Sequence, residues 1–92
     1  MRTFTATPIP VDQLTATDLR AEAQGRPDAE AYQITIYDGA GEHPHPETAD
    51  ALFVAGRLGI AWGSDATWAD VHDVEAGIDM WLNDPGSWEA AR

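Results

Sequence analysis

The sequence predicts an α+β domain with a small three-stranded sheet covered by helices, in the order β-α-β-α-β-α. Residues 31–38, AYQITIYD, alternate apolar and polar side chains with the two-residue period of a strand. Residues 71–82 place apolar side chains three and four residues apart, which is the spacing of one helix face. Of the 92 residues 43% are apolar, enough for one modest core, so we expect a single domain over residues 1–92.

The first half of the chain predicts two strands with a short helix between them. Residues 2–10, RTFTATPIP, alternate Thr with Phe, Ala and Pro, which favours an edge strand that ends near Pro10. Thr15 is followed three residues later by Asp18, as in a capping box, and Gly25 then ends the helix. The strand over 31–38 comes next.

The second half predicts two helices with a strand between them. Two Gly and two Pro make residues 38–47 a turn, and Pro46 suits the first turn of a helix that runs to about Arg57. On that helix Leu52 and Phe53 are expected to face the sheet. Residues 57–63, RLGIAWG, alternate as a third strand. The last helix, with its apolar stripe over 71–82, is ended by Asn83, Pro85 and Gly86.

Charge and composition limit the classes of partner. Sixteen Asp and Glu stand against five Arg and no Lys, for a formal net charge of −11, so direct binding to nucleic acid or to an anionic membrane is disfavoured. The chain has no cysteine, and no apolar run approaches the length of a membrane span. We therefore expect a cytoplasmic protein without disulfides.

Negative charge is concentrated in the C-terminal third, because no basic residue lies between Arg57 and Arg92. Neighbouring carboxylates on a helix are mildly destabilising, and a soluble helix usually interleaves them with Lys or Arg. One interpretation is a solvated surface whose early acids complement the helix dipole. The other is a row of carboxylates that imitates phosphates and binds a cationic groove. The candidate residues are Asp65, Asp70, Asp73, Glu75, Asp79 and Asp84.

Residues 51–85 resemble part of the antirestriction proteins of the ArdA kind, which are acidic DNA mimics encoded by mobile elements. These proteins carry a Gly-x-Leu...Trp element followed by an acidic helix that ends in an apolar residue, Leu and Pro. The resemblance implies a DNA mimic that blocks a restriction enzyme or a comparable defence complex, and small acidic anti-CRISPR proteins are an equally natural class. The matching residues here are Gly56, Leu58, Trp62, Ile78, Leu82 and Pro85.

Other chemistry finds little support in the sequence. His43 and His45 form a His-x-His pair that could bind a metal if His72 came near, but the two prolines among them favour an exposed loop, and no metal or cofactor is predicted. The serines, Ser64 and Ser87, lie outside any nucleophile motif, so we do not expect an enzyme.

Four tryptophans in so short a chain are either core residues or binding residues. Trp62 and Trp81 fit core positions, whereas Trp68 and Trp88 lie in polar, turn-like segments and are candidate anchors for a partner. The sequence thus predicts an acidic inhibitory binding protein of the DNA-mimic type, with a basic nucleic-acid-binding protein as its partner. The alternative is an acidic assembly module that associates through Trp68 and Trp88, a homodimer included.

Overall fold

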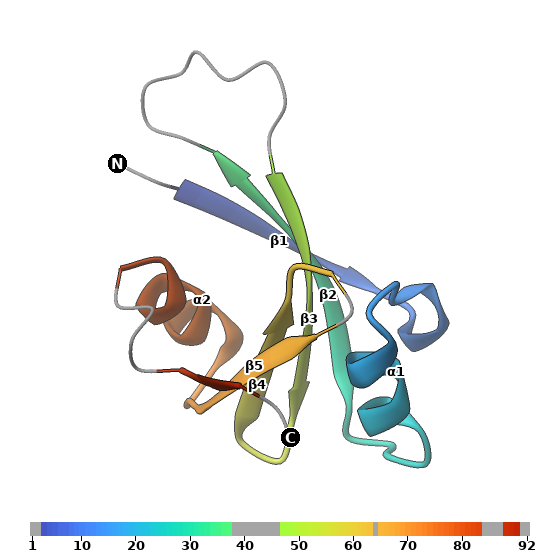
Figure 1. The fold of residues 1–92 in the computed structure, drawn as a ribbon. Coiled ribbons are helices and arrows are strands. Elements are labelled where there is room, and N and C mark those ends of the chain that lie inside the picture. The colour runs from blue at the N-terminus through green and yellow to red at the C-terminus, as the bar shows by residue number, and fades with distance from the viewer. Residues whose placement is uncertain (1–2, 38–46, 64, 84–87, 91–92) are drawn as a thin grey trace.

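An antiparallel sheet runs through the whole computed structural model, which describes residues 3–37, 47–63, 65–83 and 88–90 (Figure 1). The strands lie side by side in chain order, β1-β2-β3-β4-β5-β6, and each pairs antiparallel with the next. The strand bounds are β1 Thr3–Ile9, β2 Glu30–Tyr37, β3 Glu47–Val54, β4 Arg57–Ala61, β5 Ala66–Asp70 and β6 Glu89–Ala90.

Two α-helices cover opposite sides of this sheet (Figure 1). The 3-10 turn η1 (Val11–Gln13) and the helix α1 (Thr17–Ala23) follow β1, and the helix α2 (Val74–Asn83) follows β5. We name the two sides of the sheet after them, the α1 side and the α2 side. The class is α+β as expected, but the three-stranded sheet and the β-α-β-α-β-α order are wrong.

The largest error concerns residues 47–54, which form the central strand β3 where a helix to Arg57 was predicted. Its side chains alternate between two cores, with Ala51 on the α2 side and Leu52 on the α1 side. Because both sides are covered, the strand is apolar on both faces, and such a short apolar run cannot be told from a helix by its period. The expectation that Leu52 and Phe53 share one face is therefore also wrong.

The hairpin between β3 and β4 turns in two residues. Ala55 and Gly56 both have positive φ, 54° and 76°, and Val54 pairs with Arg57 across them. Two successive positive φ values are typical of the tight turn whose twist matches that of the flanking strands. The turn fixes the register that places Gly59 opposite Leu52.

The missed strand β5 pairs with β4 through an unusual neighbour pair. Gly59 lies opposite Trp68, and a Cβ on Gly59 would come within 2.7 Å of the Trp68 ring. The indole thus lies flat across the glycine. Any larger residue at position 59 would occupy the space that the Trp68 ring fills. The sequence predicts a polar, turn-like segment around Trp68, and this prediction is wrong because residues 66–70 form β5.

The other predicted elements are confirmed with shifted ends. Strand 2–10 is β1 at the sheet edge, strand 31–38 is β2 and strand 57–63 is β4. The helices predicted near 15–25 and 71–82 are α1 and α2. The predicted turn over 38–47, with His43 and His45, lies outside the described residues except for Glu47.

The predicted capping box at Thr15 is wrong, because α1 is capped from the sheet. Asp50 of β3 is 7% exposed, and one of its carboxylate oxygens accepts hydrogen bonds from the Thr15 amide (2.6 Å), the Thr15 hydroxyl (2.7 Å) and the Ala16 amide (3.1 Å). The Ala16 amide belongs to the N-cap residue of α1, and Thr15 directly precedes it. The cap therefore also ties α1 to the central strand.

Candidate functional site

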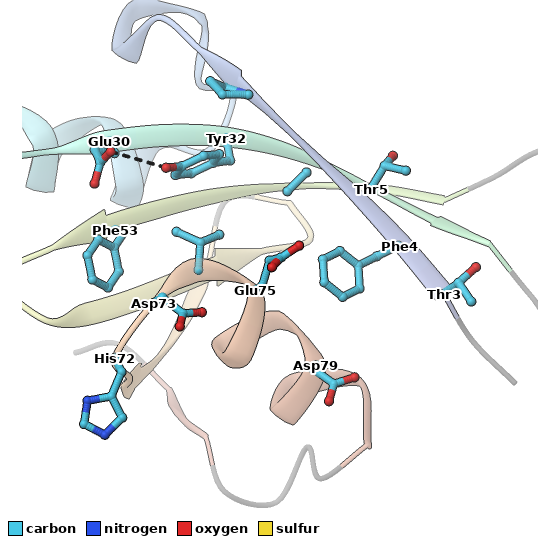
Figure 2. Close-up of a pocket in the computed structure, with 13 residues that line it drawn as sticks. Thr3, Phe4, Thr5, Glu30, Tyr32, Phe53, His72, Asp73, Glu75 and Asp79 are labelled. Atoms are coloured by element: carbon cyan, nitrogen blue, oxygen red, sulfur yellow. Dashed lines mark hydrogen bonds between the residues drawn. The ribbon is translucent and has the colours of Figure 1, made fainter.

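A groove of about 930 Å³ opens on the α2 side, between the first turns of α2 and the strands β1 to β3 (Figure 2). Three aromatic rings line it, from Phe4, Tyr32 and Phe53. Four carboxylates line it as well, from Glu30, Asp73, Glu75 and Asp79. We call this feature the acidic groove.

Strand alternation places the rings and one carboxylate on the same side. Glu30 and Tyr32 are two residues apart on β2, and Phe53 lies opposite Glu30 across the β2–β3 pair. Side chains two apart on a strand share a face, so the Tyr32 hydroxyl can donate to Glu30 Oε1, at 3.4 Å. In Figure 2 this bond lies along the β2 wall of the groove.

The helix supplies the other three carboxylates. Asp73 precedes α2, and its Oδ1 accepts from the Ala76 amide at 2.7 Å, so Asp73 caps the helix. Glu75 lies in the first turn, and Asp79 follows one turn later. In Figure 2 Glu75 and Phe4 point toward one another across the groove. The helix N-terminus favours negative charge in its first turn, which lets acids gather here without interleaved lysines.

Close packing brings α2 against the sheet beside the groove. Gly77 is buried, and a Cβ at this position would lie 2.5 Å from Leu58 Cδ2 and within 3.2 Å of both Val71 methyl groups. The glycine therefore lets the helix backbone come close to β4. Any side chain there would lift α2 and change the groove.

The cations of the described residues lie elsewhere. Arg20 donates from Nε and Nη2 to the Leu14 carbonyl, and Arg26 pairs with Glu22 at 3.1 Å. Arg57 covers the Trp68 ring on the α1 side. Among the residues that the structure places around the groove, His72 is the one basic side chain, and it points away from the sheet in Figure 2.

Burial raises the pKa of the Tyr32 hydroxyl above its ordinary value of 10.0, and the nearby Glu30 carboxylate raises it further. The phenol therefore stays protonated at neutral pH, and it keeps a proton to donate to Glu30 or to a bound group. The wall of the groove presents a neutral ring beside a carboxylate.

The predicted acidic residues divide into two groups. Asp73, Glu75 and Asp79 line the groove together, whereas Asp70 ends β5 on the α1 side, with its Oδ1 3.9 Å from Arg57 Nε. Asp65 is exposed just before β5, and Asp84 lies outside the described residues. The sequence reasoning missed Glu30, although its spacing from Tyr32 and Ile34 on one strand face could have indicated it.

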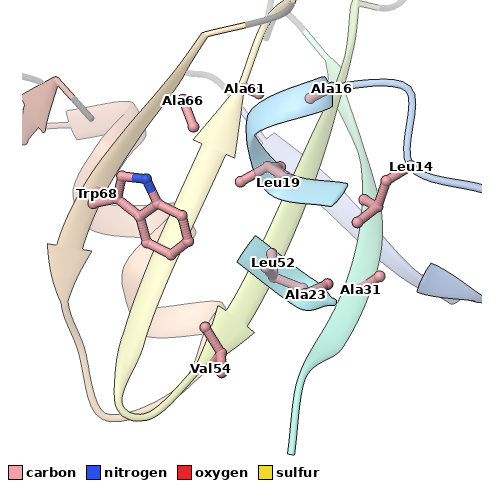
Figure 3. Packing of buried hydrophobic residues seen from close by; sticks show 10 residues of the cluster. All are labelled: Leu14, Ala16, Leu19, Ala23, Ala31, Leu52, Val54, Ala61, Ala66 and Trp68. Atoms are coloured by element: carbon pink, nitrogen blue, oxygen red, sulfur yellow. The ribbon is translucent and has the colours of Figure 1, made fainter. Parts of the chain in front are cut away.

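Trp68 and Trp62 are placed differently from the prediction, whereas Trp81, expected in the core, is partly buried against the α2-side core. Trp68 is only 8% exposed and packs in the α1-side core (Figure 3), so in this structure it offers no surface to a partner. Trp62, expected in the core, is 46% exposed and contacts Trp81 with 5.3 Å between ring centroids and a tilt of 36° between the ring planes. Trp88 is partly buried against the α2-side core, and its indole nitrogen has no hydrogen-bond partner among the described residues.

No group of three or more His, Asp or Glu side chains that could hold a metal occurs in the described part of the chain. Within the same residues, neither helix is long and apolar enough to cross a membrane. No protein-family model, curated protein or solved structure matches the chain.

Proposed function

We propose that the protein is an acidic inhibitory binding protein whose acidic groove engages a basic nucleic-acid-binding protein in place of nucleic acid. The observation that carries this proposal is the groove itself. Carboxylates from β2 and from α2, far apart in sequence, line one cavity that no arginine of the described residues enters. A field of one sign steers oppositely charged partners toward such a surface.

The amount of charge fits mimicry of a short nucleic-acid segment. Duplex DNA carries one charge per about 1.7 Å of axis, so a net charge of −11 corresponds to roughly 19 Å of duplex. Three of the four groove carboxylates stand on a strand or a helix, which supports a fixed arrangement. The resemblance over residues 51–85 favours a restriction enzyme or a comparable defence complex as the partner, and a CRISPR complex is the alternative for a small acidic protein.

A second candidate function rests on Trp62. This exposed indole, in tilted contact with Trp81, is a large apolar surface of the kind that anchors an interface. An assembly module that associates through it would keep its affinity at high salt and lose it on Trp62→Ala. The first candidate would show the opposite behaviour in both respects.

The test is a pull-down from bacterial lysate at low and at high salt with three forms of the protein. These are the wild type, a groove variant and a control variant that loses the same three charges on exposed positions outside the groove. The groove variant carries Glu30→Gln, Glu75→Gln and Asp79→Asn. The control carries Asp12→Asn, Asp18→Asn and Asp28→Asn.

We expect wild type and control to capture the same basic nucleic-acid-binding proteins at low salt, and the groove variant to lose them. A captured protein should then bind duplex DNA less well when wild type is added. Equal capture by all three forms, or capture that resists salt, would contradict the proposal.

A further inference from the structure

We propose that the acidic groove accepts an arginine side chain of the partner, with the guanidinium against the Tyr32 ring and between the carboxylates of Glu30 and Glu75. This inference rests on the proposed function, because it names the group that the groove would take from a basic partner. It follows from the kinds of side chain that the groove combines, and from a similar combination elsewhere in the molecule.

The groove combines two chemical features that a guanidinium uses together. Arginine is planar, stacks on aromatic rings and donates two parallel hydrogen bonds to a carboxylate, whereas the lysine ammonium is compact and strongly hydrated. Tyr32 and Glu30 present a ring and a carboxylate side by side, joined by the hydroxyl bond of 3.4 Å. Glu75 comes from the opposite wall, on α2.

On the α1 side of the sheet, an arginine of the chain itself already lies near both a ring and a carboxylate. The Arg57 guanidinium lies 4.8 Å from the centroid of the Trp68 ring, and its Nε lies 3.9 Å from the Asp70 carboxylate. There the chain supplies ring, carboxylate and arginine from neighbouring positions of β4 and β5. In the acidic groove the described residues supply ring and carboxylate, and the partner would supply the arginine.

The dimensions of the groove allow more than one side chain. A volume of about 930 Å³ is at the upper end of the range of small-ligand pockets. The lining includes Phe4 and Phe53, which can contact the aliphatic stem of the arginine and its neighbours. The occupant is therefore an arginine within a short basic segment of a protein.

The experiment uses three blocked tripeptides, acetyl-Gly-X-Gly-amide, in which X is arginine, lysine or the uncharged citrulline. Each is titrated into the isotope-labelled protein, and the backbone amide resonances are followed by NMR. We expect the arginine peptide to shift the amides of β2 and the start of α2 saturably, the lysine peptide to bind at least about threefold more weakly and citrulline to bind no more than marginally.

Variants locate the contacts. Glu75→Gln should weaken the arginine peptide severalfold, whereas Asp18→Asn, at the equivalent second position of α1, should leave it unchanged. Tyr32→Phe keeps the ring and should keep the preference for arginine, and Tyr32→Leu should abolish that preference. Resonances on the α1 side report that each variant is folded.

Several results would overturn the inference. If arginine and lysine peptides bind equally within the groove, the arginine site is wrong while the acidic binding function stands. If neither peptide binds and no basic protein is captured at low salt, both proposals fail. If the groove amides shift with the concentration of the protein alone, a second copy of the chain occupies the groove instead.

Discussion

The two sides of the sheet carry similar side chains but use them differently. On the α1 side Asp50 accepts three hydrogen bonds, and Arg57 covers Trp68 beside Asp70, so each of these polar groups has a partner within the chain. On the α2 side, rings and carboxylates face a groove instead. The α1 side is closed by its own residues, whereas the α2 side carries the open groove.

This difference shows how a small protein can carry a concentrated negative charge. The α1 side supplies a well-paired core and a cap that joins α1 to β3. On the α2 side, Asp73 caps α2 and the helix N-terminus favours Glu75, so the charge costs the fold little. Both sides of the sheet bury an apolar core, and the surface that we propose for recognition is the groove on the α2 side.

The largest expected loss of stability comes from Trp68 on the α1 side, and it should exceed the loss from Trp62 on the α2 side. Trp68→Ala should lower the free energy of unfolding by about 3–5 kcal/mol, because it empties the space over Gly59 in the α1-side core. Trp62→Ala should cost about 1 kcal/mol, because that ring is half exposed. Urea denaturation measures both. Equal losses would break the distinction between a closed and an open side.

The next largest difference in stability is expected between variants of two carboxylates, one on each side of the sheet. Asp50→Ala should cost about 3 kcal/mol, because three donors at the start of α1 lose their charged acceptor. Glu75→Ala should change the stability by about 0.5 kcal/mol or less, because Glu75 is exposed on the groove. Urea denaturation should also show that Asp50→Asn, which keeps one acceptor oxygen, loses less than Asp50→Ala.

Gly77→Ala tests the contact that holds α2 on the sheet. The added methyl group meets Leu58, and we expect a net loss of about 1–2 kcal/mol despite the better helix propensity of alanine. In a Leu58→Ala background the same change should become neutral or stabilising. A thermal denaturation series of the four proteins gives this coupling directly. Independent effects would mean that the contact with Leu58 does not cause the loss.

The smallest effect concerns the proton of Tyr32. In a Tyr37→Phe background, absorbance of the tyrosinate should give Tyr32 a pKa above 10.0, and Glu30→Gln should lower it toward 10.0. Because the pKa of Tyr32 is higher in the folded state than in the unfolded state, folding stabilises the protonated phenol. This contribution to stability is fully present below the unfolded-state pKa and is lost as the pH rises through the folded-state pKa. An unchanged titration in Glu30→Gln would place Glu30 away from the Tyr32 ring.

The local pattern of the sequence was enough for several elements. The two-residue period of 31–38 gave β2, and the apolar spacing of 71–82 gave α2, because each of these elements buries its large apolar side chains on one face. The concentration of carboxylates around α2 was also visible, and three of them line the groove. Charge and amphipathic period are local properties, so the order of residues determines them.

Only the tertiary structure decided the conformation of a segment that is buried on both faces and the contacts between residues far apart in sequence. Residues 47–54 resembled a helix because both faces of β3 are buried, and Trp68 became a core residue because Gly59 on the next strand makes room for it. The partners of Asp50 and the wall formed by Glu30 likewise come from segments far apart in sequence. These contacts depend on strand pairing across the sheet, and the period of a single segment holds no information about its neighbours.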